Sequence, residues 1–218
     1  MSPLAFAERP AADEPQGLLV LHHGRGTDEH DLLPLADALD PQRRLHVVTP
    51  RGPLTLPGSP GRHWYVVRQV GYPDRDTFHA GYRELAAFHD ALWQRTGLGP
   101  ERPVLGGFSQ GAVMSYALGL GPDRPAPAGI LALSGFVPVV DGWEADVDGR
   151  RGLPVFVAHG REDPVIGIGF ARLARELLEV GGIEVDYHES EGAHHVDPVL
   201  VPSAVVWLAR TLGLGRPG

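Results

Sequence analysis

The sequence predicts an α/β fold in which helices cover both faces of a doubly wound, mostly parallel sheet. Short apolar runs alternate with amphipathic segments along the chain, which is typical of strands and helices that follow one another around a parallel sheet. Hydrophobic residues make up 43% of the 218 residues and charged residues 21%, as in an ordinary globular protein. We see no internal repeat and no shift in composition, so we expect a single domain over residues 1–218.

Six apolar runs are predicted to form strands, several of them buried on both faces of the sheet. They cover residues 18–23, 45–50, 103–108, 129–136, 153–160 and 183–189.

Five helices are predicted from apolar residues at spacings of three and four and from start and stop signals. They cover residues 29–39, 76–96, 112–120, 164–180 and 197–211. Gly97 supplies a stop for the second helix. Asp163 and Asp197, each followed by a proline, are placed as start signals for the last two helices.

Two segments lack such patterns. Residues 1–16 are expected to form an N-terminal extension. Residues 51–74 are rich in glycine and proline and are expected to form an irregular loop, and a loop of that length in a compact domain is usually functional.

Charge and composition exclude several classes of function. The formal net charge of −8 argues against a nucleic-acid surface, because a polyanion needs clustered cations. Every basic residue is an arginine, so lysine nucleophiles and Schiff bases are excluded. The absence of cysteine excludes disulfides, thiolate nucleophiles and thiolate metal sites. The chain shows no signal-peptide pattern and no apolar run long enough to span a membrane, so we expect a cytoplasmic protein without stable membrane insertion.

The pattern G-x-S-x-G occupies residues 107–111, between a predicted strand and a predicted helix. This context is typical of a nucleophilic serine on a tight turn at the end of a strand. Gly107 and Gly111 leave room for the turn, and Ser109 is then projected above the sheet. An incidental serine in a glycine-rich turn is the alternative.

A serine nucleophile needs a base, and the base needs an orienting carboxylate. Asp163 follows a later strand and is the predicted acid, with Glu162 as its rival; capping the next helix is its alternative role. The predicted base is His194, with the adjacent His195 as the alternative, and His188 is expected to be structural. Two backbone N–H groups should bind the developing oxyanion. We place them at Gln110, directly after the serine, and at Arg25, in the turn H-G-R-G at residues 23–26.

The chain resembles the phospholipase/carboxylesterase group of α/β-hydrolases, which includes the acyl-protein thioesterases. The markers lie between Leu18 and about Leu208 and are LHHGRGTDEHDLLPLADAL, LGGFSQG, LALSGFVP, HGREDPVI and EGAHHVDP. The resemblance implies an α/β-hydrolase fold and places the nucleophile at Ser109, the acid at Asp163 and the oxyanion donors at Arg25 and Gln110. The histidine motif departs from the family pattern, and aligning His194 fits it better than aligning His195.

The resemblance implies hydrolysis of a small-molecule ester or thioester without metal or cofactor. Carboxylic ester hydrolysis is the leading hypothesis, and thioesterase, acyl-protein thioesterase or lysophospholipase activity on the same triad is the alternative. Residues 51–74 match the family least and are expected to shape the pocket. The side chains predicted to contact substrate are those of Trp64, Tyr65, Phe136 and Val165, with Trp143 as a further aromatic candidate.

Three further alternatives remain at this point. The chain could be an inactive binding protein that keeps the fold. The histidines of two loops, His22, His23, His194 and His195, could together hold a metal ion. A homodimer is also compatible with the sequence.

Overall fold

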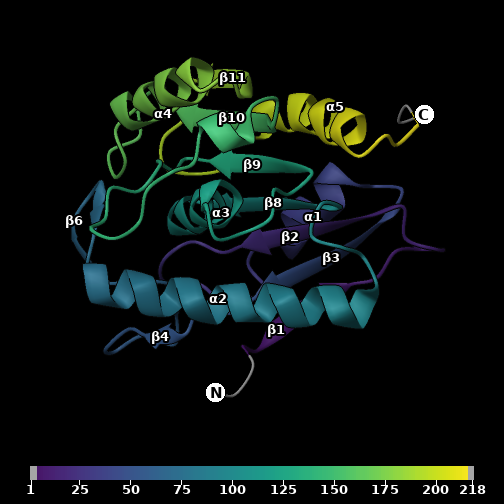
Figure 1. Ribbon diagram of the computed structural model, residues 1–218, viewed down its shortest axis with the longest axis horizontal. Helices are drawn as coiled ribbons and strands as arrows, with labels where there is room; N and C mark the ends of the chain where they lie inside the picture. Colours follow the sequence, from purple (N-terminus) through teal and green to yellow (C-terminus); the bar gives the residue numbers. More distant parts are fainter. Residues whose placement is uncertain (1–3, 216–218) are drawn as a thin grey trace.

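The computed structural model describes residues 4–215. Its main sheet contains β1 (Phe6–Arg9), β2 (Gly17–His22), β3 (Leu45–Pro50), β8 (Pro103–Phe108), β9 (Gly129–Leu133), β10 (Pro154–Gly160) and β11 (Glu184–Ser190). These strands are ordered β1-β3-β2-β8-β9-β10-β11. β1 runs antiparallel to β3, and every other neighbouring pair is parallel. The predicted mostly parallel sheet is confirmed (Figure 1).

Helices cover both faces of this sheet (Figure 1). Within the described residues these are α1 (Leu33–Leu39), α2 (Arg75–Thr96), α3 (Gln110–Leu120), α4 (Gly169–Val180) and α5 (Val201–Thr211), with short 3₁₀ turns η1 (Asp148–Arg150) and η2 (Pro198–Leu200). Alternate side chains of β2 enter different clusters: Leu19 and Leu21 pack with α1 and α5, while Leu18 and Val20 pack with α2 and α3. This alternation follows from the two-residue period of a strand.

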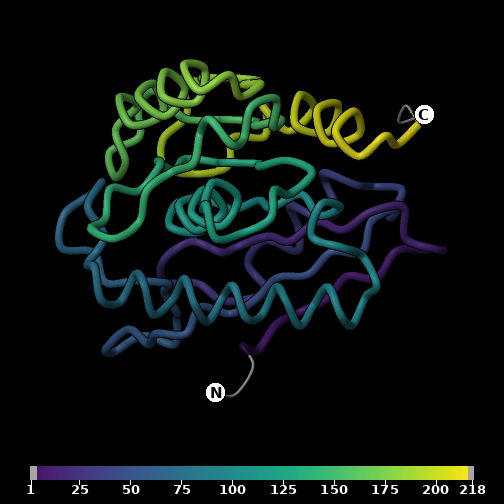
Figure 2. The backbone as a smooth tube through the Cα atoms, viewed as in Figure 1, coloured from purple at the N-terminus to yellow at the C-terminus, as the bar shows by residue number. Residues whose placement is uncertain are grey.

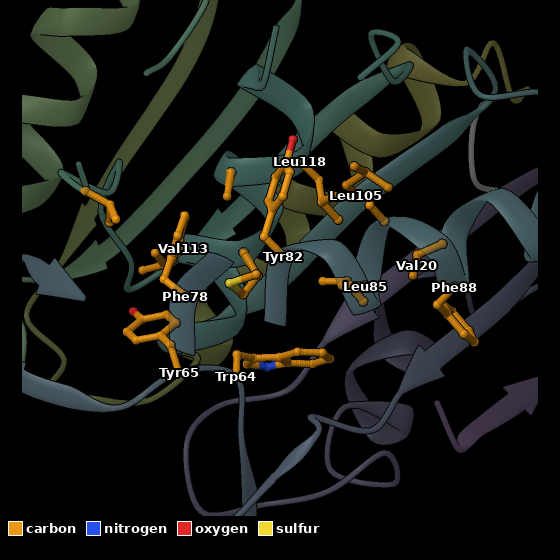
Figure 3. Close-up of a cluster of buried hydrophobic side chains, with 14 of the residues drawn as sticks. Val20, Trp64, Tyr65, Phe78, Tyr82, Leu85, Phe88, Leu105, Val113 and Leu118 are labelled. Carbon is orange, nitrogen blue, oxygen red and sulfur yellow. The ribbon is translucent and has the colours of Figure 1, made fainter. Parts of the chain in front are cut away.

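The longest helix has the stop that its sequence predicts and a cap that was not predicted. The side chain of Asp74 accepts a hydrogen bond from the N–H of Thr77, and Gly97 ends the helix in the left-handed conformation. Phe78 and Leu85 of α2 are buried, and Figure 3 shows them in one cluster with Trp64 and Tyr65.

The N-terminal segment contains a strand that the sequence did not predict. β1 pairs with β3 from Phe6 opposite Pro50 to Arg9 opposite Val47. With four residues, two of them charged, this edge strand has no apolar run. Arg9 is nevertheless buried, and its guanidinium lies 2.9 Å from the carboxylate of Asp40.

Residues 51–74 are more regular than predicted. They contain two small antiparallel pairs, β4 (Leu54–Thr55) with β5 (Arg62–His63) and β6 (Val67–Gln69) with β7 (Tyr72–Pro73). Figure 2 shows this blue stretch passing around one end of the sheet. The turn at Gly71 lies against the ring of Phe170, at the start of α4.

Several predicted boundaries are wrong. α1 begins at Leu33 rather than at residue 29, because Glu29 is held outside the helix by Arg51. α4 begins at Gly169 rather than at residue 164, so Asp163 does not cap it. β9 ends at Leu133, because Ser134 has a φ of 51° and leaves the strand. No helix among residues 4–215 has both the length and the apolar character that crossing a bilayer requires.

Candidate active site

Ser109 lies in the turn between β8 and α3. Its φ of 54° and ψ of −120° are unusual for a residue with a side chain, and such a conformation costs about 1–3 kcal/mol. A Cβ at Gly107 would lie 2.5 Å from the carbonyl carbon of Gly111, and a Cβ at Gly111 would overlap the carbonyl oxygen of His22 in β2. Both glycines are therefore required by the packing of this turn.

Asp163 follows β10 at the same edge of the sheet. One carboxylate oxygen accepts the backbone N–H groups of Val165 and Ile166, both at 2.8 Å. The imidazole of His159, which is buried and bonded to the carbonyl of Ile166 at 2.7 Å, lies 3.3 Å from the other oxygen. Burial raises the pKa of Asp163, but the hydrogen bonds from His194, Ile166 and Val165 outweigh it and hold that pKa below its ordinary value.

His194 follows β11 and lies between the other two predicted residues. Its Nδ1 is 2.7 Å from Oδ2 of Asp163, and its Nε2 is 2.9 Å from Oγ of Ser109. Since the carboxylate can only accept, Nδ1–H donates to Asp163, and Nε2 is left to accept the hydroxyl proton of Ser109. The three residues form one continuous hydrogen-bonded relay.

A cavity of about 400 Å³ opens beside this relay. Its lining residues are Arg25, Tyr65, Val67, Gln69, Val70, Ser109, Gln110, Phe136, Val165, Ile166 and His194. The predicted triad residues Ser109 and His194 and the predicted oxyanion residues Arg25 and Gln110 thus share one cavity. Its volume lies within the range of about 300–1,000 Å³ that is usual for small-molecule sites.

Comparison with known proteins identifies the family of this chain. Residues 6–211 match the sequence model of the phospholipase/carboxylesterase family. The chain belongs to this family. Acyl-protein thioesterase 1 of Gibberella zeae is 30% identical over 222 residues, covering 89% of this chain and 88% of that protein. Acyl-protein thioesterase 1 of Yarrowia lipolytica is 28% identical over 208 residues, covering 89% and 91%.

Solved structures of similar proteins include esterases. The Bacillus cereus carboxylesterase has a TM-score of 0.82 at 25% identity, covering 95% of this chain and 94% of that chain. Esterase PE8 has a TM-score of 0.80 at 28% identity, covering 96% and 100%. The α/β-hydrolase fold expected from the sequence is thereby confirmed.

The side chains predicted to contact substrate in this family member divide into two groups. Tyr65, Phe136 and Val165 line the cavity. Trp64 does not, which corrects the prediction: it is fully buried in the core, and its indole N–H donates to the carbonyl of His23 at 2.9 Å. Trp143 lines a separate surface groove.

The cavity also has wall residues that the sequence did not indicate. Val67, Gln69 and Val70 come from the β6–β7 pair, and Ile166 follows Asp163. The sequence predicts that residues 51–74 shape the pocket. Because this segment matches the family pattern poorly, the sequence could not indicate Val67, Gln69 and Val70 as the residues that do so.

The other predicted histidines and the rival acid lie apart from the relay. Glu162 is exposed beside the buried Asp163. His195 lines a different, small cavity between α1 and α5, and His188 bonds to Asp186 at 2.7 Å.

The four-histidine metal site is not formed. Nδ1 of His22 bonds to Ser115 at 2.8 Å and its Nε2 to His89 at 3.1 Å, so both ring nitrogens are occupied. Within the part of the chain that the structure describes, the cluster with metal-ligand spacing is instead Asp28, Glu29 and His30, where Glu29 is paired with Arg51.

His23 holds the turn that carries Arg25. Its Nε2 accepts the backbone N–H of Gly52 at 2.9 Å, so its protonated Nδ1 donates to the carbonyl of Gly24 at 2.7 Å. That carbonyl and the N–H of Arg25 belong to one planar peptide unit. Fixing the carbonyl therefore fixes the direction of the Arg25 N–H. Burial lowers the pKa of His23, which keeps Nε2 available as an acceptor.

The Gln110 side chain connects the two turns of the proposed oxyanion site. Its Oε1 accepts the backbone N–H of Trp64 at 2.7 Å, and its Nε2 donates to the carbonyl of Tyr65 at 2.8 Å. The indole N–H of Trp64 in turn donates to the carbonyl of His23, so these hydrogen bonds link Gln110 to the turn that carries Arg25. The sequence pattern identified the backbone N–H of Gln110 but not this use of its side chain.

Proposed function

We propose that this protein is a serine hydrolase that cleaves carboxylic esters of small or medium acyl groups through an acyl-enzyme. The observation that carries the proposal is the relay from Ser109 through His194 to Asp163, at 2.9 and 2.7 Å, beside a cavity of about 400 Å³. Membership of the phospholipase/carboxylesterase family supports the same conclusion.

The first half of the reaction transfers the acyl group to the enzyme. Oγ of Ser109 attacks the carbonyl carbon while Nε2 of His194 takes its proton. Asp163 stabilises the imidazolium, and the N–H groups of Arg25 and Gln110 bind the oxyanion. When the intermediate collapses, the leaving oxygen or sulfur takes the proton from His194.

The second half releases the acid. A water molecule attacks the acyl-enzyme as its proton passes to Nε2 of His194. Collapse of the second tetrahedral intermediate returns that proton to Oγ of Ser109 and frees the carboxylic acid.

Replacing the nucleophile tests this proposal. Ser109→Ala should lower kcat/KM on a 4-nitrophenyl ester by several powers of ten, on the order of 10⁴ or more, while the circular dichroism spectrum stays native. The wild type should label with a fluorophosphonate and Ser109→Ala should not. Ser203→Ala, on α5, is the control and should behave as wild type. Near-normal hydrolysis by Ser109→Ala would overturn the proposal.

Thioester hydrolysis is the second candidate, and relatives named acyl-protein thioesterase 1 favour it. The relay does not depend on whether oxygen or sulfur leaves, because either takes its proton from His194. An oxygen ester and a thioester of the same butyryl group test the two activities. If both react through one acyl-enzyme and its hydrolysis limits the rate, their kcat values will be equal. Turnover of the oxygen ester alone would reject the thioesterase candidate.

A further inference from the structure

Arg25 is a charged residue in the wall of the cavity beside the relay. Arg25 lines the cavity together with Ser109 and His194, and its side chain is exposed. Of the described residues that line this cavity, it is the one with a permanent charge, and none is a carboxylate. The wall is otherwise apolar apart from Tyr65, Gln69, Gln110 and the relay itself.

The carboxylates closest in sequence to Arg25 are engaged elsewhere. Glu29 is buried against the guanidinium of Arg51, and Asp28 accepts hydrogen bonds from His30. Among residues 4–215, no carboxylate oxygen lies within 4.0 Å of the Arg25 guanidinium. A cationic residue that lines a substrate cavity and has no carboxylate partner is available to an anionic ligand.

The backbone beneath this side chain is held in place. The carbonyl of Gly24 accepts hydrogen bonds from Nδ1 of His23 at 2.7 Å and from the hydroxyl of Thr27 at 3.1 Å. The N–H of Gly26 donates to the carbonyl of Arg62 at 2.8 Å. The backbone that carries the side chain is therefore fixed, so binding a ligand need not order this turn.

His63 lies near Arg25. Burial, followed by the positive field of Arg25, lowers the pKa of His63 and favours its neutral form, so the positive charge at this place is that of Arg25. The protein as a whole has a net charge of −8 and repels anions, so an anionic substrate needs a local cation in order to bind.

We propose that Arg25 binds a carboxylate on the substrate, so that the preferred substrates are esters or thioesters that carry a free acid group a few bonds from the reacting carbonyl. The inference rests on the proposed hydrolase function, because the N–H of the same residue is assigned to the oxyanion. A planar guanidinium and a carboxylate can form two parallel hydrogen bonds, which fixes the orientation of the substrate as well as its affinity.

Two matched pairs of substrates test this proposal and show which side of the substrate carries the acid. On the acyl side, the monophenyl ester of adipic acid is compared with phenyl hexanoate. On the leaving-group side, 3-acetoxybenzoate is compared with 3-acetoxybenzamide. The measured quantity is the ratio of kcat/KM for the anionic substrate to kcat/KM for its neutral partner. Because both values come from the same variant, the ratio cancels any disturbance of the oxyanion turn.

In at least one pair, Arg25→Met should lower this ratio on the order of tenfold or more, since a hydrogen bond to a charged group contributes about 1.5–3 kcal/mol. Arg25→Lys should keep part of the preference, because the charge remains but the planar fork is lost. Raising the salt concentration should lower the wild-type ratio. Arg83→Met, on α2, makes the same change in net charge away from the cavity and should leave both ratios unchanged.

The inference is overturned if Arg25→Met leaves both ratios within twofold of wild type, or if Arg83→Met lowers them equally. Failure of the proposed function has a different signature. In that case the wild type does not hydrolyse the neutral esters, or Ser109→Ala hydrolyses them as well as the wild type does.

Discussion

The two neighbouring histidines after β11 have different surroundings. His194 bonds to Ser109 and Asp163, while His195 faces a small cavity lined mainly by apolar side chains of α1, α5 and β10. The chain bends at these two residues, with the N–H of His195 bonded to the carbonyl of Ala193 at 3.0 Å, and the two side chains reach different sites.

Separate substitutions test this difference. His194→Ala should reduce kcat on the order of 10⁴-fold or more, because a triad without its base leaves Ser109 unactivated. His195→Ala should change kcat less than about tenfold, since it removes no group of the relay. Steady-state kinetics on one activated ester measures both variants. Equal losses in the two variants would contradict the assignment of the base.

We expect His23 to act on the reaction through the peptide unit of Gly24 and Arg25, if the N–H of Arg25 binds the oxyanion as proposed. His23→Ala removes the donor to the Gly24 carbonyl and should lower kcat with little change in KM. The loss should stay at or below the 10²–10³-fold that is typical when a whole oxyanion donor is removed. His23→Asn places an amide N–H near the position of Nδ1–H and should restore part of kcat.

Thr27→Val is the matched control for His23, because it removes the longer 3.1 Å bond to the same carbonyl. It should reduce kcat less than His23→Ala does. An unchanged kcat in His23→Ala would show that the turn keeps its direction without the imidazole.

The sequence predicted residues whose roles are set by local chain geometry. Gly107 is required by the tight turn itself and Gly111 by the contact of that turn with β2, and the motif that contains both located Ser109. The choice between Trp64 and Tyr65 depends on distant partners, namely the carbonyl of His23 for one and the cavity for the other. The two residues are adjacent and aromatic, so their local sequence does not indicate which side chain is buried in the core and which lines the cavity.

At the scale of elements, parallel strands explain why the site residues meet. The carboxyl ends of β2, β8, β10 and β11 lie at one edge of the sheet, and the turns after them carry Arg25, Ser109, Asp163 and His194. This convergence follows from six apolar runs that are visible in the sequence. β1 could not be predicted in this way, because its pairing with β3 depends on an edge position and a buried ion pair of Arg9.

The contact between α3 and β2 sets the position of the nucleophile turn. A methyl group at Gly111 would overlap the carbonyl oxygen of His22, and backbone on both sides leaves nowhere for it to go. Gly111→Ala should therefore lower the free energy of unfolding by about 1–3 kcal/mol and reduce kcat strongly. Chemical denaturation and ester kinetics measure the two effects.

Gly119→Ala, in the same helix, is the comparison for Gly111→Ala. A methyl group there would meet Cδ1 and Cγ1 of Ile130 at 2.5 and 2.8 Å, which belong to a side chain and can shift more easily than the backbone of β2. The variant also gains about 1 kcal/mol of helix propensity, as Gly111→Ala does. It should stay folded and active. Equal losses of stability and of kcat in the two variants would show that the contact of Gly111 with β2 is not the cause.

At the scale of the whole molecule, several histidines are buried in polar networks. His22, His23, His89 and His159 are all almost completely inaccessible to solvent. Burial lowers the pKa of each of them, and that of His89 falls to about 3. In the unfolded chain their pKa values return to about 6.5.

This difference makes the folded state sensitive to acid. Below about pH 6.5 the unfolded chain binds protons that the folded protein does not bind, so stability is full above that pH and falls as the pH decreases. Each such histidine contributes a slope of at most about 1.4 kcal/mol per pH unit. Urea denaturation at pH 7.5 and pH 5.5 should therefore show a clear loss of stability at the lower pH.

Substitution of one buried histidine should reduce this loss. His89→Gln removes a group that titrates only in the unfolded state, so its stability should fall less between the two pH values than that of wild type. A pH dependence that is identical in His89→Gln and wild type would contradict this explanation.

The small β6–β7 ribbon forms one wall of the cavity, while the relay is anchored to the main sheet. The relay and part of the cavity wall thus come from separate pieces of polypeptide. We expect mutations at Val67, Gln69 and Val70 to alter which acids and alcohols are accepted while the relay keeps its geometry. The range of substrates can thus change during evolution without a change in the catalytic residues.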